Sequence, residues 1–172
     1  MVEPHRQKAI DLMARLNESG YSVLTVSTEH PKWLSVAVSQ ILALTGEDEI
    51  ITAGHTLEGY DIHSVMDDEQ DTAEGKIQVL TEKMLIVAEF GPQKVKTIAL
   101  PLHATTSVVV NTIRDAMTTR GPENWPDRVA FELDVAGSTF NFPPGQVSTY
   151  QHDELPRALK VVTSALTSKV KE

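Results

Sequence analysis

Two histidines stand just ahead of an acidic run in the segment GHTLEGYDIHSVMDDEQD, which covers residues 54–71. The nitrogens of His55 and His63, with a carboxylate oxygen of Asp67 or Asp68, form a ligand set that suits zinc, iron or manganese. The spacing matches no metal motif, however, because the segment contains no H-E-x-x-H and no complete EF-hand loop. Since an acidic loop between strands is usually solvated, we expect no bound metal and no cofactor here.

Signatures of nucleophilic and phosphate chemistry are also missing from the sequence. Neither G-x-S-x-G nor the phosphate-loop pattern G-x-x-x-x-G-K occurs. Ser64 beside His63 is a neighbour in sequence only, which is not the geometry of a catalytic triad. We therefore predict that the protein is not an enzyme. A metal-dependent enzyme built on His55, His63 and Asp67 is kept as a second alternative.

Five residues could instead serve in binding. Tryptophan is enriched at binding hot spots, which makes Trp33 and Trp125 candidate anchors, and Trp125 lies in the proline-rich stretch GPENWPD that we expect to be exposed. Lys83, Lys94 and Lys96 border a predicted hairpin and could form a small positive patch. Lysines at sheet edges also prevent edge-to-edge pairing, so both uses stay open.

The overall charge and the length of the apolar runs limit the classes of partner. The formal net charge is −9, so the field of the whole chain repels phosphate backbones, and we expect no nucleic acid partner. The N-terminal stretch lacks the apolar core of a signal peptide. The longest apolar runs fall far short of the roughly 20 residues of a membrane helix. A cytoplasmic protein is the expectation.

The elements that must position these residues follow from apolar periodicity. Helical spacing predicts helices over 4–17, 31–45 and 155–166. Between the second and third helices, β-rich runs separated by turn residues predict six or seven antiparallel strands. The runs are DEIITAG, GKIQVLTEKMLIVAEFG, TIALPLH followed by SVVV, and VAFELDVAGSTFNF. Pro101 lacks an N–H donor and so places TIALPLH at a sheet edge or a bend.

Four stretches in this order resemble a bacterial pleckstrin-homology (PH-like) domain over about residues 47–170. They are TGEDEIITAG, GKIQVLTEKMLIV, TIALPLHATTSV and VAFELDVAGSTFNF, followed by a closing helix. The resemblance implies an α+β fold, a PH-like antiparallel β-sandwich or partly open barrel capped by a C-terminal amphipathic helix, with two N-terminal helices in addition. It divides the chain into an N-terminal helical extension, 1–46, and a PH-like domain, 47–172.

The resemblance narrows the function without fixing it, because PH-like scaffolds serve as lipid readers, peptide binders or oligomerisation units. Between Gly54 and Gly75 there is no Lys or Arg, which argues against the usual phosphoinositide site. We therefore predict a non-catalytic binding or assembly module that recognises a protein partner or itself. The first alternative is a lipid or membrane-surface binder that uses Lys83, Lys94 and Lys96.

Overall fold

Helices at both ends of the chain enclose two antiparallel sheets in the computed structural model, which describes residues 2–65, 71–117, 125–145 and 153–168. Two helices come first, α1 (Pro4–Glu18) and α2 (Lys32–Thr45). The strands follow as β1 (Thr52–His55), β2 (Gly75–Leu80), β3 (Met84–Phe90), β4 (Val95–Pro101), β5 (Thr105–Thr112), β6 (Ala130–Val135) and β7 (Ser138–Phe142). The last helix is α3 (Glu154–Ser168). The predicted α+β order of elements is confirmed.

The strands divide into a four-stranded sheet in the order β1-β2-β3-β4 and a three-stranded sheet in the order β5-β6-β7. A short 3₁₀ turn, Leu102–Ala104, carries the chain from β4 into β5 and joins the two sheets. Both β4 and β5 are edge strands, which confirms the position expected for the strand that holds Pro101. The stretch at 21–28 forms an extended connection whose Val23 bridges to Asp61.

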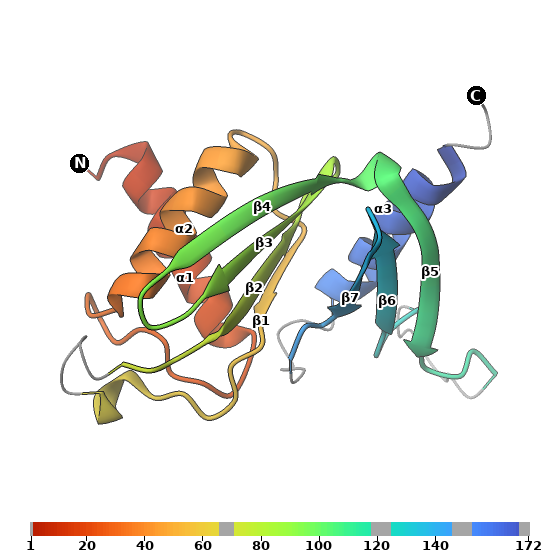
Figure 1. The fold of residues 1–172 in the computed structure, drawn as a ribbon. Helices are drawn as coiled ribbons and strands as arrows, with labels where there is room; N and C mark the ends of the chain where they lie inside the picture. The colour runs from red at the N-terminus through yellow and green to blue at the C-terminus, as the bar shows by residue number, and fades with distance from the viewer. Residues whose placement is uncertain (1, 66–70, 118–124, 146–152, 169–172) are drawn as a thin grey trace.

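The four-stranded sheet is buried on both faces, which explains why β2 and β3 read as nearly continuous apolar runs. One face, including Ile77, Val79 and Ile86, packs with α1 and α2 in a first apolar cluster. The other face, including Leu85 and Val87, belongs to a second cluster shared with the three-stranded sheet and α3. Figure 1 shows the result, with α1 and α2 on one side of this sheet and the second sheet on the other.

The N-terminal helices share a core with the sheet. Leu12 and Leu16 of α1 and Leu34, Val38 and Ile41 of α2 are fully buried or nearly so, in the same cluster as the strand residues. The division of the chain expected from the sequence had set these helices apart as an N-terminal extension, whereas their buried side chains pack with the strands. The proposed boundary between residues 46 and 47 stays a prediction.

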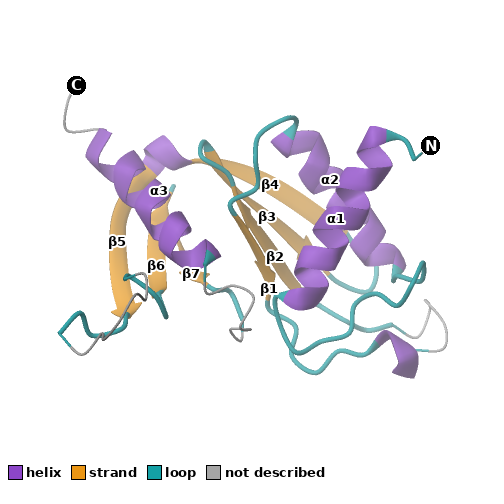
Figure 2. Cartoon of the chain, turned by 180° about the vertical axis from the view of Figure 1, so that it is seen from behind, coloured by secondary structure: helices purple, strands orange, loops and turns teal. Residues whose placement is uncertain are grey.

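The three-stranded sheet and α3 complete the second cluster. Phe131, Leu133 and Val135 alternate inward along β6, and β6 turns into β7 at Ala136 and Gly137, which both have positive φ angles (51° and 83°) as a type I′ hairpin requires. The apolar stripe of α3 lies against these strands, and Figure 2 shows the helix from behind. None of the described helices is long and apolar enough to cross a membrane.

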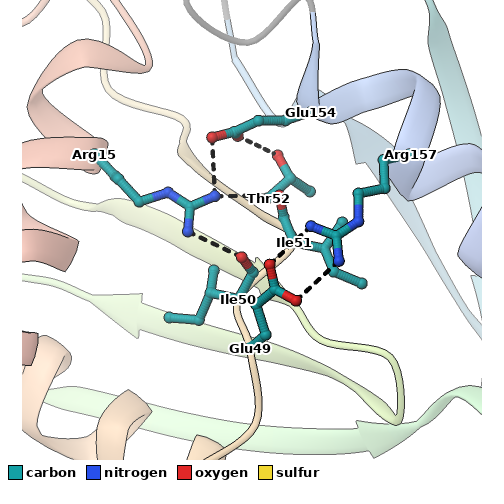
Figure 3. A network of polar contacts seen from close by, with 7 residues as sticks. All are labelled: Arg15, Glu49, Ile50, Ile51, Thr52, Glu154 and Arg157. Carbon is teal, nitrogen blue, oxygen red and sulfur yellow. Dashed lines mark hydrogen bonds and ion pairs between the residues drawn. The ribbon is translucent and has the colours of Figure 1, made fainter.

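A polar network ties the first helix to the last across the outer edge of β1 (Figure 3). The Arg15 guanidinium donates to the backbone carbonyls of Ile50 (2.9 Å) and Ile51 (3.1 Å) and to Glu154 Oε1 (2.8 Å). Thr52 Oγ1 donates to the other Glu154 oxygen (3.0 Å). Side chains of α1 and α3 therefore cover the backbone where this edge begins.

Beside this network lies a second ion pair, which is exposed and joins the segment just before β1 to α3. Both guanidinium nitrogens of Arg157 donate to Glu49, each at 2.9 Å. The hydrogen bonds and charge of Arg157 hold the pKa of Glu49 below its ordinary value, and those of Glu49 raise the pKa of Arg157. The bidentate contact fixes the direction in which α3 approaches the sheet.

Candidate binding groove

An aromatic cluster marks the place where α2 meets the end of β3. The Trp33 ring stacks on Phe90 with centroids 4.1 Å apart and planes 10° from parallel, and it meets Tyr60 edge-on at 5.8 Å. Only 8% of Trp33 is exposed. Trp33 therefore does not project as the exposed anchor that the sequence suggested, and instead forms a rigid wall.

Asp71 holds this cluster to the loop that follows β1. Its Oδ2 accepts hydrogen bonds from Trp33 Nε1 (2.9 Å) and Tyr60 OH (2.8 Å), and its Oδ1 accepts one from the Ala73 N–H (3.0 Å). A buried carboxylate is tolerated when donors replace its water, and here three donors do so. The acidic run was expected to be solvated, and for Asp71 this is wrong because its buried carboxylate is the partner of the buried Trp33 indole and the half-buried Tyr60 hydroxyl.

A hollow of about 400 Å³ lies between this cluster and the β3–β4 turn, with Lys32, Trp33 and Val36 on the helix side and Gly91 to Val95 on the turn side. A second hollow of about 500 Å³ continues it along β4, with Gln40, Ala43 and Leu44 on the helix side. Lys94 and Val95 line both hollows. We call the two together the α2–β4 groove.

The backbone of β4 is open toward this groove. The hairpin closes where Gly91 N donates to Lys94 O (3.0 Å), and β3 pairs with β4 in unbroken register from there. In an antiparallel ladder, alternate residues point their N–H and C=O groups away from the partner strand. On β4 these outward residues are Val95, Thr97 and Ala99. No described residue pairs with their outward backbone groups.

The groove combines this open backbone with exposed apolar side chains and positive charge. Val36 and Leu44 of α2 are 37% and 39% exposed. Lys32, Lys94 and Lys96 are exposed, and within the described part of the chain none of the three forms an ion pair. The groove is therefore an apolar channel with an unneutralised positive rim on a chain of net charge −9.

The structure brings together three of the five predicted binding residues. Trp33, Lys94 and Lys96 all line the groove. Lys83 lies at the opposite end of β3, which at about 3.3 Å per strand residue is roughly 20 Å away. Its ammonium pairs with Asp48 at 2.9 Å. The positive patch proposed for lipid binding is thus split across the length of the sheet.

Trp125 lies apart from the groove, next to the end of β5. It is 51% exposed, as its proline-rich stretch predicted, and its Nε1 donates to the backbone carbonyl of Arg114 (2.9 Å). Arg114 in turn pairs with Asp127 at 2.8 Å. The indole nitrogen is therefore already engaged, and only the ring face is presented to solvent.

The two candidate metal histidines occupy different environments. His55 sits on β1, 4% exposed, where its Nδ1 accepts a hydrogen bond from Leu57 N (3.2 Å). Burial lowers the pKa of His55, and an interaction with the Leu16 backbone that raises the pKa offsets this effect only in part. The ring is therefore neutral at pH 7. His63 is exposed in the short turn Ile62–Ser64. Among the described ranges, no three His, Asp or Glu side chains are grouped to hold a metal ion, while Asp67 and Asp68 lie outside those ranges.

Sequence reasoning missed the residues that shape the groove around Trp33. Lys32, Tyr60, Asp71 and Phe90 had been assigned no role, although each is essential to the walls or rim of the hollow or to holding Trp33 in place. One signal was present for Phe90, which ends an apolar strand directly before the turn residues Gly91 and Pro92. No pattern in the sequence pairs Asp71 with a tryptophan 38 residues earlier.

Comparisons with protein-family models, with curated proteins and with solved structures found no match to this chain.

Proposed function

We propose that the chain is a non-catalytic binding module that takes up an extended segment of a protein partner along the open edge of β4. The observation that carries this proposal is the contrast between the two edges of the four-stranded sheet. Arg15 and Glu154 cover the start of the β1 edge, whereas β4 presents, beside an apolar groove, backbone groups with which no described residue pairs. Strand addition to such an edge gives affinity through main-chain hydrogen bonds and specificity through alternate side chains.

The edge of the second sheet at β5 is less suited to strand addition. The pairing of β5 with β6 shifts register twice, between Thr105 and Ser107 and again between Val110 and Thr112. Such irregularities twist an edge away from further pairing. The pairing of β4 has no shift between Val95 and Pro101, so an unbroken ladder of alternating donors and acceptors is offered there. Pro101 ends that ladder because it has no N–H.

The finer fold belongs to the same proposal. A four-stranded and a three-stranded antiparallel sheet that share a core with a C-terminal helix fit a PH-like sandwich, and we propose that assignment for residues 47–172. Under it, α1 and α2 are additions that cover one face of the first sheet, and α2 builds the helix side of the groove. We still expect the protein to be cytoplasmic.

A strand-edge variant tests the proposed function directly. Ala99→Pro removes an outward N–H without touching the ladder to β3, and proline is tolerated on a sheet edge. Ala99→Val is the matched control because it keeps the N–H and a strand-favouring side chain. A phage-displayed library of random peptides, panned on the full chain, supplies the probes. Peptides enriched on the wild type should bind Ala99→Val with similar affinity and Ala99→Pro at least tenfold more weakly.

The same experiment can overturn the proposal. If no peptide is enriched, or if enriched peptides bind Ala99→Pro as well as the wild type, an extended segment does not add to β4. Light scattering of the wild type over a range of concentrations identifies the case in which the segment comes from a second copy. An oligomer that dissociates in Ala99→Pro but not in Ala99→Val would replace the separate partner with self-association at this edge.

A further inference from the structure

We propose that the segment bound along β4 is acidic on the face that meets Lys96 and apolar on the face that meets α2. This inference rests on the proposed function and adds to it the chemistry of the partner. Its basis is the placement of charged and apolar side chains on the two faces of β4, which differ from each other.

A row of alternating charges crosses the sheet and ends at its open edge. Lys76 of β2 lies opposite Glu89 of β3, and Glu89 lies opposite Lys96 of β4. The Lys76 ammonium is 3.5 Å from the Glu89 carboxylate, so Glu89 is already shared by a lysine on the inner side. Opposite charges that lie directly across neighbouring strands stabilise a sheet, and like charges destabilise it. The next strand therefore continues the row best with Asp or Glu opposite Lys96.

The backbone geometry brings that acidic side chain close to its lysine. Lys96 points its own N–H and C=O toward β3, so an added strand meets it at a non-hydrogen-bonded position, where opposed side chains are nearest. Lys94 lies two residues back on the same edge, at the hairpin turn, and Lys32 lies across the first hollow from it. A second acidic residue, two positions from the first, would lie on the same face of the strand as the first and close to Lys94, whereas Lys32 belongs to the face that carries α2.

The opposite face of β4 selects apolar side chains. Thr97 points toward α2, because its Oγ1 donates to Gln40 Oε1 (2.7 Å). Alternate residues of an added strand point the same way. There they meet Val36 and Leu44, whose exposed surfaces flank the groove. The partner segment thus alternates apolar and acidic residues over about five positions, the stretch of β4 before Pro101 ends the ladder.

The distribution of charge favours the β4 edge over the rest of the surface as the place where an acidic segment binds. The chain carries 24 acidic and 15 basic side chains, so most of its surface repels an acidic segment. Asp71 also lines the first hollow, but its oxygens already accept hydrogen bonds from Trp33, Tyr60 and Ala73. The lysines at the rim are exposed and form no ion pair with any described residue. Attraction at this rim would guide an acidic segment to β4.

Three peptides of about nine residues test the inference on the full chain. The peptide GVEVEVEVG is compared with GVQVQVQVG and GVKVKVKVG by isothermal titration calorimetry. If two cross-strand pairs form, the glutamate peptide should bind roughly two- to twentyfold more tightly than the glutamine peptide, and the lysine peptide should bind most weakly. Lys96→Glu should remove or reverse this order. Lys160→Glu, which makes the same charge change on α3 away from the groove, should preserve it.

The outcomes separate the two proposals. If the three peptides bind equally well and Ala99→Pro abolishes binding, the partner is not selected by charge and the β4 edge is still the site. If Lys160→Glu alters the order as much as Lys96→Glu does, the preference comes from net charge, which overturns the inference. If none of the three binds the wild type, the inference also fails. Binding that Ala99→Pro leaves intact overturns the proposed function itself.

Discussion

Replacing Asp71 should destabilise the whole protein although the residue belongs to an acidic loop. Asp71→Ala leaves the Trp33 Nε1–H and the Tyr60 hydroxyl without their acceptor and frees the Ala73 N–H. Each hydrogen bond to a charged group contributes about 1.5–3 kcal/mol, and a buried donor left unsatisfied costs about 1–3 kcal/mol. Since Tyr60 and Ala73 can recover water, we expect a loss of about 2–4 kcal/mol in the free energy of unfolding.

Two further variants show whether the acceptor itself is responsible. Asp71→Asn preserves the shape but offers one acceptor oxygen in place of two, so its cost should be about half that of Asp71→Ala. Trp33→Phe removes the indole donor, and the double variant Trp33→Phe/Asp71→Ala should then be less destabilised than the two single changes added together, by about 1–2 kcal/mol. Asp61→Ala is the control, because Asp61 accepts one bond in an exposed turn from His63 N. It should cost about 1 kcal/mol or less.

Urea unfolding followed by far-ultraviolet circular dichroism measures these differences without relying on Trp33 fluorescence. The midpoints convert to free energies if the slope of the transition is unchanged among variants. A cost for Asp71→Ala within about 0.5 kcal/mol of the wild type, the range of ordinary surface changes, would refute the assignment. Additive effects of Trp33→Phe and Asp71→Ala would refute the specific hydrogen bond between them.

Two other predictions concern the surroundings of His55. Burial lowers the pKa of His55 below its ordinary 6.5, so the unfolded chain takes up a proton first, and stability should fall as pH drops below 6.5 by at most about 1.4 kcal/mol per pH unit. His55→Asn, whose oxygen can accept the Leu57 N–H, should flatten that loss in urea titrations at pH 7.5 and 5.5; an unchanged slope contradicts it. A Cβ at Gly145 would clash with the His55 backbone oxygen, whereas one at Gly91 meets nothing within 4 Å. Gly145→Ala should therefore cost about 1–3 kcal/mol and Gly91→Ala little by thermal unfolding, and equal costs would refute this packing.

Much of the fold could be read from local patterns, because periodicity and turn chemistry act over a few residues. The helices over 4–17 and 31–45 matched α1 and α2 within a residue at each end, and the helix over 155–166 lies within α3. The run VAFELDVAGSTFNF was readable as strands for the same reason, and it holds β6 and β7. The docking of α1 and α2 on the sheet was not predictable, since it depends on which face of β2 and β3 meets which helix, and both faces are apolar.

The groove could be predicted only in part, because it depends on contacts between distant segments. Lys94 and Lys96 were singled out as strand-edge lysines, which is where they lie. Asp71 was read as part of a solvated run, since all six residues before Gly75 are polar or small, and nothing local shows that a carboxylate will replace water around Trp33. His55 was grouped with His63 by type, although one belongs to a buried strand and the other to an exposed turn.

The contact between Arg15 and Glu154 closes a loop of 139 residues, and this separation has a consequence for the order of assembly. Contacts between distant segments pay a large loop-closure entropy and form late. A chain still emerging from the ribosome would hold α1 and β1 without α3, so that Arg15 could donate to the Ile50 and Ile51 carbonyls but would lack Glu154, and Thr52 would lack its acceptor. Until α3 is made, the start of the β1 edge would be covered by α1 alone. Completion of the final helix thus completes the cover at this edge of the first sheet.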